Sequence, residues 1–187
     1  MEKILRINDD RYQILFSKKM ISKKISELAA RIKSDYAGKD QEPILIYVLT
    51  GAIFFGADMS KKLDKIKFRH HIDSIGLKRF SKDEVGGAVE IVSRPHANFR
   101  NRDVIVVEDV VDNGATMNFL NDLLINGDNP PRSIEYCILG LKNSHGPLNF
   151  SIKYLGFDNL GPEWIVGYGL DSNQAYRGLE DIWVKID

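Results

Sequence analysis

Two carboxylates and a run of small polar residues lie close together in the middle of the chain. Glu108 and Asp109 come first, and the run that follows is Asp112, Asn113, Gly114, Ala115 and Thr116. Small residues let backbone N–H groups approach an anion, and a helix beginning at such a loop points its positive dipole end to the same place. Ionised carboxylates only accept hydrogen bonds, which suits the two O–H donors of a vicinal diol. A phosphate site beside a diol site predicts a ligand that contains ribose 5-phosphate.

The segments around these residues indicate the elements that hold them. Val104 to Val107 is an unbroken β-branched run, typical of a strand buried on both faces, and the two carboxylates stand where that strand should end. Met117 to Leu120 has helical spacing. A second buried strand, Ile44 to Leu49, precedes Thr50-Gly51-Ala52 and a helix to about Leu63. Strands that run into glycine-containing turns and helices predict a doubly wound sheet, whose ligands bind at the carboxyl ends of the strands.

The rest of the chain predicts the same fold class. A helix is expected from Ile21 to Tyr36, and further strands are expected at Tyr12–Phe16, Ile66–Gly76, Val89–Val92 and Ser133–Leu141. From Lys142 onward the alternation fades into short strands and turns. We predict one α/β domain with a central, mostly parallel sheet flanked by helices over about residues 12–141. A small hood lobe would cover residues 142–187, with a contribution from the N-terminus.

The composition limits the class of protein. The 187 residues, 43% hydrophobic and 28% charged, suit a single soluble domain with a sizeable core. Lysine plus arginine and aspartate plus glutamate each number 26, so we expect no nucleic-acid partner. No apolar run approaches the ~20 residues of a membrane span, so we expect no membrane partner. The single cysteine, Cys137, excludes an internal disulfide, which favours a reducing compartment and a cytoplasmic protein.

The central motif resembles the 5-phosphoribosyl-1-pyrophosphate (PRPP) motif of the type I phosphoribosyltransferases. That motif is an apolar strand, two acidic residues, two aliphatic residues and then Asp-Thr-Gly-x-Thr. Here Asn113 and Ala115 replace the commoner Thr and Lys, which leaves the loop small and polar. The resemblance implies that Glu108 and Asp109 hold the ribose hydroxyls of PRPP and that residues 112–116 hold its 5-phosphate.

Two other segments resemble loops of the same family. The first resembles the pyrophosphate loop of purine phosphoribosyltransferases and consists of Leu49, Thr50 and Gly51. In that loop a cis peptide turns backbone N–H groups toward the departing group; Leu49–Thr50 occupies its place, without the Lys that many members have. The second, polar and glycine-bearing, runs from Leu77 to Ala88 and resembles the long flexible loop that closes over the site. Arg79 and Phe80 replace its usual Ser-Tyr pair, and the alternative is an ordinary surface loop.

The C-terminal part carries the most specific resemblance. Residues 164–171 read Trp-Ile-Val-Gly-Tyr-Gly-Leu-Asp, and residues 176–182 read Tyr-Arg-Gly-Leu-Glu-Asp-Ile. Both resemble the C-terminal signature of hypoxanthine and hypoxanthine–guanine phosphoribosyltransferases, and Leu-Gly-Phe at 155–157 resembles an element that precedes it. With the loops above, the resemblance covers most of the chain, from about residue 12 to residue 182.

This resemblance implies how the purine is held. Trp164 would stack on the base, although a lone aromatic at the start of a strand is more often a core residue. The backbone of Ile165 would bond the edge of the base, with Asp171 beside it. A lysine would bond the 6-oxo group. Lys142, in the pattern Leu-x-Lys, is the preferred candidate, and Lys153 is the alternative.

The remaining implied roles concern pyrophosphate, metal and proton. Arg177 would contact pyrophosphate, since its fork of donors matches phosphate oxygens. Mg²⁺ is the implied cofactor, held by Asp171 with Glu108 and Asp109. Asp112 would act as general base at N7 of the purine; the alternative is a carboxylate that only caps the loop.

The implied activity is purine salvage. A phosphoribosyl group would pass from PRPP to hypoxanthine, and to guanine, through an oxocarbenium-like state, giving IMP or GMP and pyrophosphate. One alternative is a phosphoribosyltransferase for xanthine or another base. A second is a non-catalytic nucleotide sensor that binds nucleic acid, which the neutral charge and the retained Asp112, Asp171 and Arg177 disfavour. Members of the family usually form dimers or tetramers, so a homo-oligomer is expected.

Overall fold

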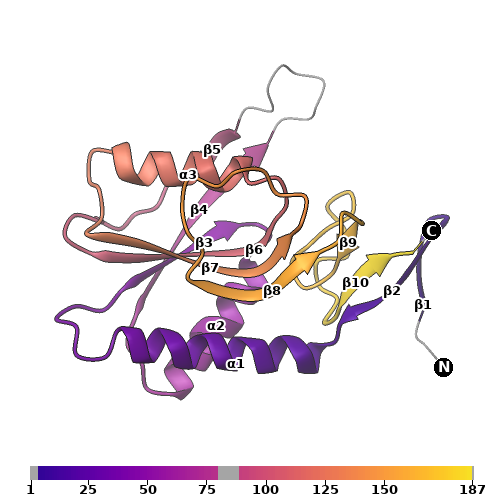
Figure 1. The fold of residues 1–187 in the computed structure, drawn as a ribbon, viewed down its shortest axis with the longest axis horizontal. Coiled ribbons are helices and arrows are strands. Elements are labelled where there is room, and N and C mark those ends of the chain that lie inside the picture. Colours follow the sequence, from indigo (N-terminus) through magenta and orange to yellow (C-terminus); the bar gives the residue numbers. More distant parts are fainter. Residues whose placement is uncertain (1–3, 80–88, 187) are drawn as a thin grey trace.

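The computed structural model describes residues 4–79 and 89–186, which form two β-sheets with helices against the larger one (Figure 1). In chain order the elements are β1 (Ile4–Ile7), β2 (Asp10–Phe16), α1 (Lys18–Asp35), β3 (Ile44–Leu49), α2 (Ile53–Lys65), β4 (His71–Arg79), β5 (Val89–Ser93), β6 (Asp103–Val111), α3 (Ala115–Asn126), β7 (Ser133–Lys142), β8 (Tyr154–Leu160), β9 (Ile165–Val166) and β10 (Ile182–Lys185). No helix in these two ranges is long and apolar enough to cross a membrane.

The larger sheet confirms the predicted fold class. Its strand order is β5-β4-β3-β6-β7-β8. Strands β4, β3, β6, β7 and β8 run parallel, and β5 pairs antiparallel with β4 at one edge. From β3 the chain adds β4 on one side, whereas β6, β7 and β8 follow on the other side. The strand order therefore reverses between β3 and β6, and ligands of open α/β sheets bind at the carboxyl ends of strands at such a point.

Helices cover both faces of this sheet, with α1 and α2 on one face and α3 on the other (Figure 1). The side chains of β6 alternate between the two layers. Ile105 and Val107 pack in the cluster that contains α1 and α2, whereas Val104 and Val106 pack in the cluster that contains α3. All four are 0% exposed, which confirms the prediction of a strand buried on both faces.

The helices follow from local sequence signals. The side chain of Ser17 accepts the N–H of Met20 and caps α1. Apolar residues at helical spacing turn one side of α1 to the sheet, and the buried ones are Ile21, Ile25, Leu28, Ala29 and Ile32. Amphipathic faces of this kind hold α1 against the sheet and leave its lysines toward solvent.

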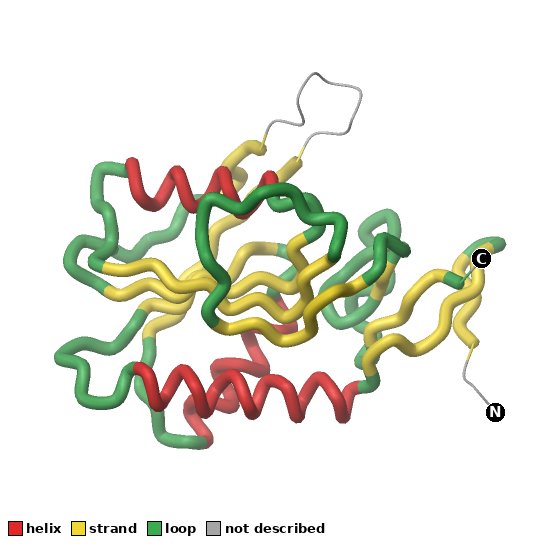
Figure 2. The backbone as a smooth tube through the Cα atoms, in the orientation of Figure 1, coloured by secondary structure: helices red, strands yellow, loops and turns green. Residues whose placement is uncertain are grey.

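The smaller sheet, the hood, has the strand order β1-β2-β10-β9 and is antiparallel throughout. The first and the last described residues, Ile4 and Ile186, lie at this sheet, since β1 begins at Ile4 and β10 ends at Lys185 (Figure 2). Its own small core contains Ile7, Tyr12, Val166 and Trp183. The predicted N-terminal contribution to the hood is therefore present, in the form of two paired strands.

The boundary predicted at residues 141/142 needs correction in two places. Strand β8, assigned to the hood, pairs in parallel with β7 and belongs to the main sheet. Strand β2, whose residues 12–16 were assigned to the core, pairs with β10 in the hood. Both assignments depend on partners far away in the sequence, which local patterns do not report.

Several element ends also differ from the sequence prediction. Strand β4 begins at His71 and not at Ile66, which caps the end of α2. Strand β6 does not end before Glu108 but continues to Val111, because Val110 and Val111 still pair with Gly140 and Leu141 of β7. Strand β4 extends to Arg79, into the segment predicted as a loop; Phe80 lies outside the described residues.

Candidate functional site

The phosphate loop, defined as residues 112–116, joins β6, which ends at Val111, to α3. Its last two residues, Ala115 and Thr116, already form the first turn of α3. Gly114 has a φ of +81° at the N-cap, a left-handed conformation that favours glycine. The side-chain oxygen of Asn113 accepts the N–H of Ala115 at 3.1 Å. A glycine turn that opens a helix presents backbone N–H groups to an anion, so the geometry suits a phosphate.

A cavity of about 90 Å³ lies beside the phosphate loop. Its wall contains Glu108 and Arg79, the last residue of β4, together with residues of the loop. Oε2 of Glu108 is buried and has no hydrogen-bond partner within the described ranges. Burial, with the neighbouring Asp109 carboxylate, raises the pKa of Glu108 well above its ordinary value. A buried acceptor without a donor is suited to a ligand hydroxyl.

Asp109 lies against the turn that follows β3. A side chain at Gly51 would collide with the Asp109 carboxylate, so the two segments touch. The peptide bond between Leu49 and Thr50 in this turn is cis, as expected. Asp109 is 5% exposed, and its Oδ1 accepts the N–H of Val110 at 2.7 Å. Burial raises the pKa of the Asp109 carboxyl despite that N–H.

Asp112 meets the end of β7. Nζ of Lys142 lies 3.7 Å from Oδ1 of Asp112, and the hydroxyl of Ser144 donates to the same oxygen at 3.3 Å. The lysine side chain is 7% exposed, whereas the Asp112 side chain is 58% exposed. Sequence reasoning missed Ser144. Its position just after the carboxyl end of a parallel strand was the available signal.

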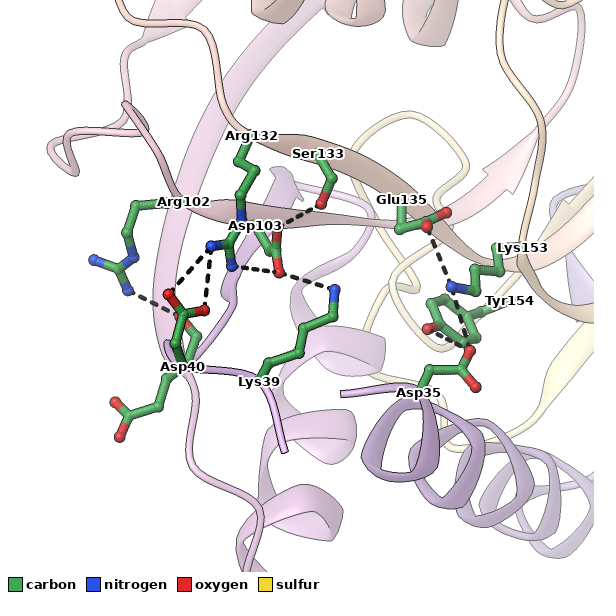
Figure 3. Close-up of polar contacts among 11 residues, drawn as sticks. Asp35, Lys39, Asp40, Arg102, Asp103, Arg132, Ser133, Glu135, Lys153 and Tyr154 are labelled. Carbon is green, nitrogen blue, oxygen red and sulfur yellow. Dashed lines mark hydrogen bonds and ion pairs between the residues drawn. The ribbon is translucent and has the colours of Figure 1, made fainter. Parts of the chain in front are cut away.

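Lys153, the alternative to Lys142, lies elsewhere. Its Nζ is 3.4 Å from Oδ2 of Asp35 on α1 and 3.2 Å from Oε1 of Glu135 on β7 (Figure 3). Glu135 stands near the amino end of β7, whereas Lys142 ends that strand. The structure therefore brings Lys142, and not Lys153, to Asp112.

The C-terminal signature residues lie in the hood and in the segment between β9 and β10. Trp164 is 54% exposed, which leaves its ring accessible, whereas the Ile165 side chain is 7% exposed in the core. Nη2 of Arg177 lies 2.8 Å from Oδ1 of Asp171. A side chain at Gly169 would collide with the carbonyl oxygen of Gly51, so the hood touches the turn after β3.

The three carboxylates expected to bind Mg²⁺ do not form a cage by themselves. No cluster of three or more His, Cys, Asp or Glu side chains arranged for a metal occurs in residues 4–79 and 89–186. Oδ2 of Asp171 accepts the N–H of Gln174 at 2.8 Å, while its other oxygen pairs with Arg177. Mg²⁺ usually keeps several waters and binds through one or two carboxylates together with substrate phosphates. The oxygen donors fit Mg²⁺ in that shared form.

Larger cavities lie away from these residues. One of about 540 Å³ has Lys39 and Arg102 in its wall, and another of about 530 Å³ lies between α1, α2 and the hood, with Tyr168 in its wall. Neither contains a residue of the predicted site. The site is therefore identified by its position at the carboxyl ends of the parallel strands and not by the volume of a cavity.

Known proteins share this sequence and fold. The phosphoribosyl transferase domain family matches residues 12–173. A hypoxanthine-guanine-xanthine phosphoribosyltransferase of Tritrichomonas foetus is 35% identical over 178 residues, which cover 94% of this chain and 92% of that protein.

Two solved structures agree over nearly the whole chain. The hypoxanthine phosphoribosyl transferase of Trypanosoma cruzi superposes with a TM-score of 0.86 at 28% identity, covering 97% of this chain and 95% of that one. A hypoxanthine-guanine phosphoribosyltransferase of Bacillus anthracis gives 0.82 at 31% identity, covering 94% and 98%. Because the family match and the 35% relative both extend over most of the chain, this protein belongs to the phosphoribosyl transferase domain family.

Proposed function

We propose that the protein transfers the phosphoribosyl group of PRPP to a 6-oxopurine, hypoxanthine with guanine as a second base, and releases pyrophosphate. The observation that carries this proposal is the pair formed by Lys142 and Asp112, 3.7 Å apart at the end of the phosphate loop. O6 and N7 are adjacent acceptor positions on the edge of an oxopurine. A lysine donor facing O6 and a carboxylate acceptor facing a protonated N7 match that edge. Adenine would present an amino donor to the lysine instead.

The phosphoribosyl end of PRPP would occupy the phosphate loop and its cavity. Backbone N–H groups at the start of α3 would bind the 5-phosphate. Glu108, whose Oε2 has no partner within the described ranges, would accept a hydrogen bond from a ribose hydroxyl, with Asp109 beside it. Burial raises the pKa values of both carboxyls, because it disfavours their charged forms. Hydrogen bonds from ribose hydroxyls would stabilise those charged forms.

The pyrophosphate group would lie where the turn after β3 meets the hood. The backbone from Leu49 to Gly51 and the guanidinium of Arg177 would bind its oxygens. Asp171 would hold Mg²⁺, and Glu108 and Asp109 would supply further carboxylate oxygens. When bound with PRPP, Mg²⁺ neutralises charge on the departing pyrophosphate.

The proton chemistry would fall to Asp112. As the bond from C1 of the ribose to the pyrophosphate oxygen breaks, N9 of the purine forms the new bond to C1. The base then carries one proton too many, and the Asp112 carboxylate would accept it from N7. Trp164 would stack on the base, and the backbone at Ile165 would bond its edge. Arg79 ends β4 beside the phosphate loop, where a closing segment would exclude water from the reactive sugar cation.

Pyrophosphate release with PRPP and Mg²⁺ tests the proposal, with hypoxanthine, guanine, xanthine and adenine offered separately. Release with hypoxanthine, with or without guanine, and none with adenine is the expected result. Release with xanthine alone would instead favour a phosphoribosyltransferase for xanthine. The name of the Tritrichomonas foetus relative includes xanthine beside hypoxanthine and guanine. PRPP binding without turnover on any base would instead favour the nucleotide sensor.

We further propose, on the family resemblance, that the protein forms a homo-oligomer, a dimer or a tetramer. Light scattering behind a sizing column measures the mass directly against the 21.2 kDa of one chain. A mass of two or four chains is expected, and a monomer at all concentrations would overturn this part.

A further inference from the structure

One hydrogen bond joins the hood to helix α2 at the edge of the site. The hydroxyl of Tyr168 donates to Oδ2 of Asp58 at 2.8 Å. Asp58 lies on α2, the helix that follows the Leu49–Gly51 turn, and Tyr168 lies between β9 and Asp171. The bond therefore connects the helix that follows the Leu49–Gly51 turn with the segment that leads to Asp171 and Arg177, and the proposed function assigns the binding of pyrophosphate to that turn and to Arg177.

The backbone of the hood is in an uncommon conformation at this point. Tyr168 has a φ of +54°, between Gly167 at +96° and Gly169 at +106°. A bulky residue is rarely found in the left-handed region, so its surroundings must hold it there. The N–H of Tyr168 donates to the carbonyl of Leu179 at 2.8 Å, and its side chain is 6% exposed. The buried ring and its hydroxyl thus anchor a backbone that would otherwise relax.

The residue after Tyr168 touches both parts of the pyrophosphate site. Gly169 packs so closely on Gly51 that a side chain would collide with the Gly51 carbonyl oxygen. The N–H of Gly169 donates to the carbonyl of Arg177 at 2.9 Å, and Nη1 of Arg177 donates to the carbonyl of Gly169 at 2.6 Å. A displacement of Tyr168 would therefore move Gly169 relative to both Gly51 and Arg177.

We propose that Tyr168 and Asp58 are positioning residues, whose hydrogen bond fixes the register between the Leu49–Gly51 turn and the Asp171–Arg177 segment. This inference rests on the proposed function, because it assigns the pair a part in recognising pyrophosphate. Burial and the adjacent Asp58 carboxylate raise the pKa of the Tyr168 hydroxyl, which keeps it a donor across the neutral range.

The purine end of the site has a separate anchor. Strand β9 pairs with β10 through Ile165 and Val184, and the N–H of Lys185 donates to the carbonyl of Trp164 at 2.8 Å. Loss of the Tyr168–Asp58 bond should therefore weaken recognition of pyrophosphate and leave recognition of the base intact.

Tyr168→Phe tests this, with Tyr154→Phe as the matched control. The Tyr154 hydroxyl also donates to a helical aspartate, Asp35 on α1, at 2.9 Å, but away from the site (Figure 3). Each variant removes one tyrosine–aspartate bond, so similar losses of thermal stability are expected. Only Tyr168→Phe should raise KM for PRPP and Kd for magnesium pyrophosphate, each about tenfold. KM for hypoxanthine should stay within about twofold in both.

Asp58→Leu tests the other end of the bond, because leucine has a similar volume and no oxygen to accept the Tyr168 hydroxyl. It also removes the ion pair of Asp58 with the exposed Lys61, which contributes little. It should raise the same two constants, and the double variant should be no worse than Tyr168→Phe alone, because both changes remove the same hydrogen bond. Additive effects of the two changes would overturn the proposal. So would equal KM values for PRPP in Tyr168→Phe and Tyr154→Phe, or an equal rise in KM for hypoxanthine and for PRPP.

Failure of the proposed function is distinguishable from failure of this inference. If the wild-type protein binds magnesium pyrophosphate but turns over no base, the proposed function fails and the Kd values alone decide on the positioning pair. If the wild-type protein binds no pyrophosphate, both are overturned.

Discussion

The two ends of strand β6 carry buried carboxylates that differ in their hydrogen bonds. At the amino end, Asp103 is 2% exposed and accepts hydrogen bonds from Arg132 at 2.9 and 3.0 Å, Ser133 at 2.7 Å and Lys39 at 2.9 Å (Figure 3). At the carboxyl end, Oε2 of Glu108 is buried without a partner within the described ranges. The pKa of Asp103 is lowered, chiefly by hydrogen bonds from Arg132, whereas burial raises the pKa of Glu108.

The difference separates stability from function along one strand. A carboxylate with four donors stabilises the fold at neutral pH, because its charge is fully compensated. A buried carboxylate without donors destabilises the empty protein and is retained where a ligand supplies the donors. The amino end of β6 therefore serves the fold, and we expect its carboxyl end to serve the proposed site. The following changes, from the largest expected effect to the smallest, test that division.

Asp112→Asn should give the largest effect, and it should lower turnover without changing stability. Loss of a general base typically lowers turnover roughly 10²–10⁴-fold. The Asp112 side chain is 58% exposed and Asn keeps its shape, so PRPP affinity and thermal stability should change little. Steady-state kinetics with hypoxanthine, PRPP binding by calorimetry and a thermal melt check the three parts. Unchanged turnover would remove Asp112 as the base.

Asp103→Asn should give the reverse result. Losing the charge that Arg132 and Lys39 share should lower the free energy of unfolding by roughly 2–4 kcal/mol. Turnover per folded molecule should stay at the wild-type value, since Asp103 lies at the other end of the sheet. Urea unfolding and kinetics on the same preparation measure both quantities.

The pH dependence of that variant provides its control. The folded-state pKa of Asp103 is below the ordinary value of 3.8, so its contribution is complete above that value and is lost as pH falls through the folded-state pKa. The gap in unfolding free energy between wild type and Asp103→Asn should therefore be full at pH 6 and shrink below about pH 4. A gap that stays constant into acid would contradict the assigned role of the charge.

Replacing the two candidate lysines should separate them. Lys142→Met should raise KM for hypoxanthine at least about tenfold, because a charged donor to O6 is lost. Lys153→Met should leave that KM within about twofold, since Nζ of Lys153 is engaged by Asp35 and Glu135. A larger effect on KM from Lys153 would reverse the assignment.

Glu108→Gln should give the smallest change, a gain in stability. Replacing a carboxylate whose Oε2 is buried without a partner within the described ranges by a neutral amide should raise the free energy of unfolding by about 1 kcal/mol at neutral pH. The same change should weaken PRPP binding, because the amide is a poorer acceptor for a ribose hydroxyl. A loss of stability on urea unfolding would show that Glu108 already has a partner in the empty protein.

Much of the fold could be predicted because its signals are local. The β-branched run at 104–107 and the capped, amphipathic helix after Ser17 specify themselves through neighbouring residues. In the sequence an acidic pair is followed by a turn of small residues and then by helical spacing, and this order indicates the phosphate loop. The end of β6 was misplaced, since its extension to Val111 depends on pairing with Gly140 and Leu141.

The sequence by itself determined most of the strands and helices and the run of small polar residues that forms the phosphate loop, because hydrophobic periodicity and turn residues act over a few positions. Only the tertiary structure decided which lysine meets Asp112, that Gly51 packs on Asp109 and Gly169, and that Tyr168 bonds to Asp58. Those contacts join segments far apart in the chain, and they exist only where sheet pairing and core packing have brought the segments together.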